Sequence, residues 1–174
     1  MIYVVEHVVA NYGGDPQLRA NTSELDFALP SAWYDLGVGE AHRYMASRVL
    51  LRSSEPTPPF VPNVAIQYIS LGITEVIRVG ELDTTMDLHA LDAEVIDHEV
   101  RCGGYLCVDT GTYSTDGFEV KTRRSQLTYS VPGDSMLAIL TATAALDGWD
   151  AVELEIATME DGWLTATIPT DGSD

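Results

Sequence analysis

Residues 94–144, EVIDHEVRCGGYLCVDTGTYSTDGFEVKTRRSQLTYSVPGDSMLAILTATA, decide the fold of this 174-residue chain. They contain four runs rich in β-branched and aromatic residues, separated by short turns built on glycine, proline and aspartate. Runs of this composition predict strands, and turns this short join antiparallel neighbours. We therefore expect an antiparallel meander of four strands, over 94–101, 105–113, 118–130 and 135–144.

The last of these strands predicts how the sheet is covered. Residues 135–144 are apolar at both alternating sets of positions, so both faces of this strand should be buried and the strand should be central. Asp147 is then placed to cap a final helix. That helix has an apolar stripe made of Trp149, Val152, Ile156 and Met159. We expect it to cover the sheet and to end at Gly162, with a short extended piece over 163–168.

The N-terminal half predicts further strands by the same criteria. They are expected over 2–9, 24–29, 44–52 and 63–70, with a proline-stiffened loop at 53–62. Residues 74–92 begin with strand composition but continue with apolar positions at helical spacing, so we expect a helix over most of them. The predicted fold class is α+β, an antiparallel β-sheet flanked by helices. It forms one domain over 1–168, and a mobile acidic tail follows at 169–174.

The charge balance excludes several classes of partner. Nine basic side chains stand against 27 acidic ones, which gives a net charge of -18. A polyanionic surface repels phosphate backbones and anionic lipid headgroups, so neither nucleic acid nor membrane insertion is expected. The expected partner is a basic or apolar segment of another protein. A halophilic or high-GC source would explain the same composition, and the sequence leaves both interpretations open.

Three of the nine basic residues gather in one predicted strand, as Lys121, Arg123 and Arg124. They admit two interpretations. Such residues can form ion pairs inside a negatively charged molecule, where they serve stability alone. They can instead form a partner-binding site, a local positive spot that orients an anionic group of the partner. We take these three as the candidate partner-binding residues.

One string resembles a catalytic motif, since Asp109-Thr110-Gly111 follows an apolar run as in aspartic proteases. That chemistry needs two carboxylates sharing one proton. No second such loop is evident, and the predicted strand runs straight through Asp109. We therefore expect a non-enzymatic protein without catalytic residues, and an aspartic hydrolase using Asp109 is the weakest alternative.

Metal and cofactor sites are not expected either. Cys102 and Cys107, with His98 nearby, suggest zinc, but a structural zinc site needs four ligands and the sequence offers no second ligand pair. The two cysteines flank a predicted glycine turn without facing one another, so we expect free thiols.

Several stretches together resemble the PsbP-like superfamily, in particular its LpqN-type and DcrB-type bacterial members. The resemblance covers about residues 24–168. It rests on residues 25–33 (LDFALPSAW), residues 60–64 (FVPNV), Gly103-Gly104, the turn Asp116-Gly117, residues 140–144 (LTATA) and Trp149 in the terminal helix.

This resemblance implies an α/β/α sandwich and a binding function without shared catalytic residues. The family includes cell-envelope lipoproteins and chaperones of secreted effectors. Because no signal peptide or lipobox is apparent, we expect a cytoplasmic protein. The expected function is that of a chaperone, or an immunity or adaptor partner, of an effector in bacterial secretion. The alternative is a lipid or glycolipid carrier of LpqN type, which predicts a sizeable apolar cavity between sheet and helix.

Overall fold

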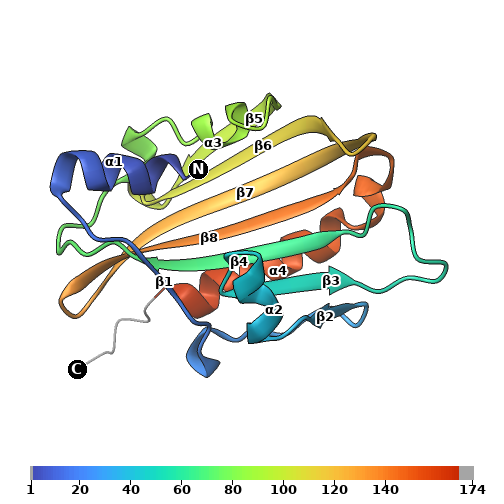
Figure 1. The fold of residues 1–174 in the computed structure, drawn as a ribbon, viewed down its shortest axis with the longest axis horizontal. Helices are drawn as coiled ribbons and strands as arrows, with labels where there is room; N and C mark the ends of the chain where they lie inside the picture. The colour runs from blue at the N-terminus through green and yellow to red at the C-terminus, as the bar shows by residue number, and fades with distance from the viewer. Residues whose placement is uncertain (1, 169–174) are drawn as a thin grey trace.

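An eight-stranded antiparallel sheet is the framework of the computed structural model, which describes residues 2–168 (Figure 1). Seven strands follow the order β2-β3-β4-β8-β7-β6-β5, and β1 shares with β3 the edge of β4 that faces away from β8. The strands are β1 (Gln17–Arg19), β2 (Trp33–Asp35), β3 (Arg48–Arg52), β4 (Asn63–Ser70), β5 (Glu94–Arg101), β6 (Leu106–Thr115), β7 (Phe118–Val131) and β8 (Asp134–Ala145). The predicted α+β class is confirmed.

The predicted meander is confirmed as β5 to β8, with β6, β7 and β8 slightly longer than expected. Asp116 and Gly117 both have positive φ between β6 and β7, which a tight two-residue hairpin turn requires. β8 lies between β4 and β7 and is buried on both faces through most of its length. Its central position follows from its uniformly apolar sequence.

The prediction of a strand over 2–9 is wrong, because these residues belong to helix α1 (Tyr3–Tyr12). Val4 and Val8 are one helical turn apart and both are completely buried. They pack in a second hydrophobic core with Leu71 and Leu137, on the face of the sheet away from the final helix. This tertiary packing outweighs the local preference of β-branched residues for strands.

Residues 24–29 also differ from the prediction. They form no strand, and a short 3₁₀ helix, η1 (Ser23–Leu25), precedes an extended segment. Leu25, Phe27 and Leu29 nevertheless pack, partly buried, against the main core. The alternation of apolar and polar residues therefore identified the side chains that face the core correctly. It did not show that the segment forms hydrogen bonds with a neighbouring strand.

The long helix expected over 74–92 is replaced by two short pieces, η2 (Val79–Glu81) and α3 (Met86–His89). Val79 and Leu88 are both buried. Each of these side chains reaches the core from its own short helical turn, so no continuous helix is needed to bury both. The strand expected over 44–52 is shorter than predicted as well, because Met45 has a positive φ and β3 begins only at Arg48.

The final helix runs further than predicted. A 3₁₀ helix, η4 (Leu146–Ala151), leads into α4 (Glu153–Thr167), which passes through Gly162 without ending. A Cβ atom at Gly162 would lie 3.2 Å from the Phe27 ring, so glycine here allows close packing. The predicted extended piece over 163–168 is wrong, because Trp163 is fully buried on the helix. The predicted tail at 169–174 lies outside the described residues.

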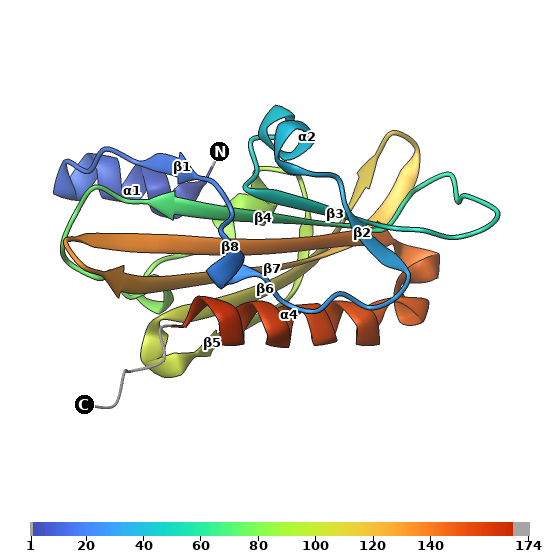
Figure 2. The same ribbon diagram turned by 90° about the horizontal axis from the view of Figure 1, so that it is seen from below.

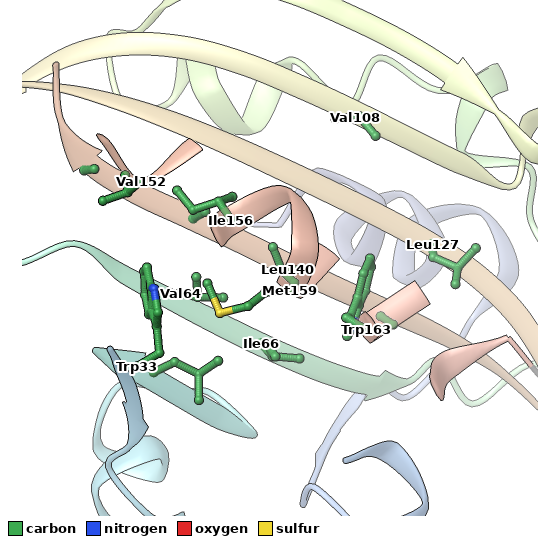
Figure 3. Packing of buried hydrophobic residues seen from close by; sticks show 14 of the residues in the cluster. Trp33, Val64, Ile66, Val108, Leu127, Leu140, Val152, Ile156, Met159 and Trp163 are labelled. Carbon is green, nitrogen blue, oxygen red and sulfur yellow. The ribbon is translucent and has the colours of Figure 1, made fainter. Parts of the chain in front are cut away.

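The helices form layers on both sides of the sheet. α4 covers one face, while α1, α2 (Val38–Arg43) and α3 lie on the other (Figures 1 and 2). The predicted apolar stripe is confirmed, since its four residues are buried beneath η4 and α4. Figure 3 shows Ile156, Met159 and Trp163 of α4 among the strand residues of the main core. Among the described residues, no helix combines the length and apolarity needed to cross a bilayer.

Candidate ligand-binding site

The main core is densely filled beneath α4, and a cavity opens where this helix ends. The cavity has a volume of about 550 Å³ and lies between the last turn of α4, the adjoining ends of β4, β7 and β8, and the segment after β1. Its lining includes Leu25, Tyr68, Tyr129, Val131, Met136 and Thr167. Most of these surfaces are apolar, and the volume lies within the range of about 300–1,000 Å³ found for small-molecule sites.

The sheet register places the strand residues of this cavity together. Tyr129 on β7 is directly opposite Met136 on β8, and Tyr68 on β4 is opposite Ala138. Because alternate residues of a strand share a face, these side chains point to the same side as α4. Tyr68 and Met136 are buried, and Tyr129 is half-buried.

Three polar atoms in and behind the cavity are buried without a partner among the described residues. They are the Tyr68 hydroxyl, the Thr167 hydroxyl and the Trp163 indole nitrogen. Thr167 and Trp163 lie close enough to Tyr68 to influence its pKa, yet no hydrogen bond of good geometry forms among the three. All three atoms are shielded from solvent, so they lie behind the open surface of the cavity.

Neither tyrosine of the site is charged at physiological pH. Burial raises the pKa of Tyr129 to about 12, and the neighbouring Tyr68 adds to the rise. Burial also raises the pKa of Tyr68. Both phenols are therefore neutral at physiological pH and can donate hydrogen bonds. The exposed side of the lining carries Arg19 and Glu24, one charge of each sign.

The predicted basic residues lie on β7 but do not form one surface. Lys121 and Arg123 are on the side of α4, where the Lys121 ammonium is 4.8 Å from the centre of the Trp149 ring. The Arg123 Nε donates to the Glu160 carboxylate at 2.9 Å. Because successive side chains of a strand point to opposite faces of the sheet, Arg124 lies on the other face from Lys121 and Arg123.

Arg124 points to the opposite face of the sheet. Its guanidinium lies 2.9 Å from the Asp87 carboxylate of α3 and donates to the Thr141 hydroxyl. The contacts of Arg123 and Arg124 match the ion-pair interpretation, whereas Lys121 contacts an aromatic ring. None of the three lines the cavity, and their role in binding a partner stays a prediction.

Asp109 lies inside β6 rather than in a loop, and it is completely buried. Its Oδ1 atom is 2.6 Å from Nδ1 of His98 on β5. The partner of this aspartate is thus a histidine, and the strand geometry differs from the loop that the protease signature needs. Within residues 2–168 no group of three His, Cys, Asp or Glu side chains is arranged to hold a metal ion. Cys102 and Cys107 are free thiols.

Most basic side chains are used within the fold. Within residues 2–168, seven of the eight arginines form ion pairs with carboxylates, namely Arg43, Arg48, Arg52, Arg78, Arg101, Arg123 and Arg124. Two of these pairs fasten α4 to the sheet. Arg52 of β3 binds Glu155, which also accepts a hydrogen bond from Trp33, and Arg123 of β7 binds Glu160. The many other acids consequently dominate the exterior.

Comparison with known proteins identifies the fold and leaves the family open. No protein-family model matches the chain, and no curated protein matches it. Among solved structures, the chain shares its α+β architecture with LpqN, which is involved in cell envelope biogenesis of Mycobacterium tuberculosis. The TM-score is 0.55, with 16% sequence identity over 85% of this chain and 82% of LpqN. The likeness supports an LpqN-like fold, and membership of the PsbP-like superfamily remains a prediction.

The cavity residues carry no motif that the sequence could have revealed. Tyr68 and Tyr129 occur in predicted strands, and a buried tyrosine usually finds a hydrogen-bond partner. The sequence therefore marked Tyr68 and Tyr129 only as aromatic residues with a hydroxyl group inside apolar strands. Thr167 lies in a segment expected to be extended, so its proximity to Tyr68 could not be foreseen.

Proposed function

We propose that this protein is a non-catalytic binding protein that holds the apolar part of a small amphipathic molecule, of lipid or glycolipid type, in the cavity at the end of α4. The observation that carries this proposal is the mainly apolar cavity of about 550 Å³ with Tyr68, Tyr129 and Thr167 in its lining. Apolar walls with a few converging polar groups are typical of ligand sites. The fold is shared with LpqN, a protein involved in cell envelope biogenesis, and a ligand of lipid type would suit such a role.

The charge of the protein selects among such ligands. With a net charge of -18, the surface repels anionic headgroups over the range of a Debye length. The neutral phenol of Tyr129, which is half-buried in the lining, can hydrogen-bond a hydroxyl group. The expected ligand therefore has an acyl chain and an uncharged, hydroxylated headgroup.

Binding of monooleoylglycerol and of oleate tests this proposal, because the two share a chain and differ in headgroup charge. Titration calorimetry and the fluorescence of the nearby Trp163 supply the readouts. We expect monooleoylglycerol to bind and oleate to bind more weakly. The proposal would be refuted if the wild-type protein bound neither compound.

A pair of variants locates the site. Ala166 lines the cavity and Ala157 lies on the same helix with similar half-burial but away from the cavity. Ala166→Phe should weaken monooleoylglycerol binding by about tenfold or more, because the larger side chain occupies the ligand's space. Ala157→Phe should leave binding unchanged. Equal binding by the two variants would place the ligand elsewhere.

The acidic exterior supports a second proposal, that the protein binds a basic or apolar segment of another protein. In this proposal it acts in the cytoplasm as a chaperone, or as an immunity or adaptor partner, of a secreted effector. The supporting observation is that the basic residues are largely consumed by internal ion pairs, which leaves exposed acids to steer a basic partner. In this second proposal, Lys121, Arg123 and Arg124 contact the partner only through the parts of their side chains that stay exposed. Lys121 already lies over the Trp149 ring, and the two arginines are already paired with acids.

Salt dependence separates the two proposals. Binding of a basic partner should weaken steeply between about 0.02 M and about 0.3 M salt, since the Debye length shortens over that range. Binding of an uncharged amphipath in the cavity should change little. A partner recovered by pull-down and then bound equally at both salt concentrations would contradict acidic steering.

A further inference from the structure

β5 (Glu94–Arg101) is the last strand of the sheet that residues 2–168 form. Within these residues it forms a ladder with β6 alone, so its outer edge is unpaired. Alternate residues of such an edge strand direct their N–H and C=O groups away from the sheet. No hydrogen bond within the described residues reaches these outward groups of β5. The other end of the sheet is β2, which has only three residues, so β5 is the longer open edge.

The side chains of β5 divide by face. Glu94, Asp97, Glu99 and Arg101 share the face of α4, because their partners on β6 lie on that side, and the Arg101 guanidinium pairs with the Glu99 carboxylate. Glu94 and Asp97 are exposed and Glu99 is half-buried. The opposite face presents Val100, which is 49% exposed. Ile96, at the irregularity between residues 95 and 97, is 56% exposed. The edge thus offers the exposed acids Glu94 and Asp97 on one face and apolar surface beside them.

A second copy of this chain is a poor occupant of the edge. Two copies pairing antiparallel through β5 are related by a twofold axis normal to the sheet, which keeps each face on its own side. Glu94 and Asp97 of one copy would therefore lie on the same side as those of the other. Each copy also carries a net charge of -18, so two copies repel one another. The charge pattern instead complements a strand with basic residues.

We propose that an extended segment of a partner protein, with lysine or arginine at alternate positions and apolar residues between them, adds to β5 as a further strand. Its backbone pairs with the open edge, and main-chain hydrogen bonds supply affinity as in other strand additions. Its basic side chains lie over Glu94 and Asp97, since Glu99 is already paired with Arg101. Its apolar side chains cover Val100. This site rests on the second proposed function, the binding of a basic protein segment, and assigns that segment a place and a conformation.

Three labelled peptides test the site without knowledge of the natural partner. The peptide KVKVKVK has the required alternation, EVEVEVE reverses the charge, and KVKPKVK keeps the charge but lacks a central N–H group. We expect KVKVKVK to bind by fluorescence anisotropy at low salt. EVEVEVE should not bind, and KVKPKVK should bind about tenfold more weakly, because proline cannot pair in a ladder.

Hydrogen exchange and one matched pair of variants show where the peptide sits. On addition of KVKVKVK, amide exchange should slow within residues 94–101. Asp97→Lys should weaken binding about tenfold, whereas Asp161→Lys, an equal charge change at an exposed position of α4, should change it less than about twofold. Both positions are exposed, so neither substitution should disturb the fold. An unchanged melting temperature of each variant checks this.

The outcomes distinguish failure of the site from failure of the second proposed function. Salt-sensitive binding with protection outside 94–101, or with equal losses in Asp97→Lys and Asp161→Lys, would refute the β5 site and leave a basic partner in place. Absence of any binding of KVKVKVK and KVKPKVK would refute both.

Discussion

Removing the cation from a buried ion pair tests how α4 is held to the sheet. Glu160 is 4% exposed, and its carboxylate accepts hydrogen bonds from Arg123 on β7 and from the Ser125 hydroxyl. Arg123→Met leaves this carboxylate buried without its cation. Breaking a buried pair from one side costs about 3–5 kcal/mol. Because the Arg123 side chain is 23% exposed and water can partly replace it, we expect the low end, about 3 kcal/mol.

Urea unfolding followed by tryptophan fluorescence measures this loss, and in thermal unfolding the melting temperature should fall by roughly 6–12 °C for a domain of this size. The double variant Arg123→Met/Glu160→Met removes both charges and should recover most of the stability. Arg43→Met, which breaks the exposed pair with Glu40, should cost less than about 0.5 kcal/mol. A loss below about 1 kcal/mol in Arg123→Met, or a double variant no more stable than the single one, would show that the pair does not fasten α4.

Three further predictions concern a close contact and two titrations. Gly14→Ala should destabilise by about 1–3 kcal/mol in urea unfolding, because its Cβ atom would lie 2.4 Å from the Leu71 carbonyl oxygen. The Arg52 hydrogen bond lowers the pKa of Glu155, so this group stabilises the fold above the ordinary carboxyl pKa and loses that effect as pH falls through the lowered value. The difference in unfolding free energy between wild type and Glu155→Gln should therefore shrink from neutral to strongly acidic pH, and a constant difference would contradict it. The pKa of Tyr129, about 12, exceeds that of a free tyrosine, so stability should fall as pH rises from about 10 to about 12. Tyr129→Phe should remove one late-ionising phenol from an ultraviolet absorbance titration.

The meander could be predicted from sequence because its information is local. Each strand of residues 94–144 is bounded by its own turn, and the apolar character of β8 on both faces marks it as central. Helix α1 could not be predicted in the same way. Its β-branched residues favour a strand locally, and the helix forms because Val4 and Val8 meet a core built from β4 and β8. That surface exists only in the folded chain.

The candidate sites show the same limit. Alternation along β7 already assigned Lys121 and Arg123 to one face and Arg124 to the other. The acids that pair with the two arginines, Glu160 and Asp87, lie 37 residues away in each case, in segments whose positions were not known from sequence. The cavity is a space left between three strands and one helix. No residue pattern encodes such a space directly.

The position of Lys121 has a consequence for chemical modification of the protein. It is the only lysine of the chain, and its ammonium lies over the Trp149 ring of η4. Acetylation removes the charge on which a cation–π contact depends, while methylation keeps it. An enzyme or reagent that acts on lysine side chains therefore has one target in this protein. The emission of Trp149 would report directly whether that amine still carries its charge.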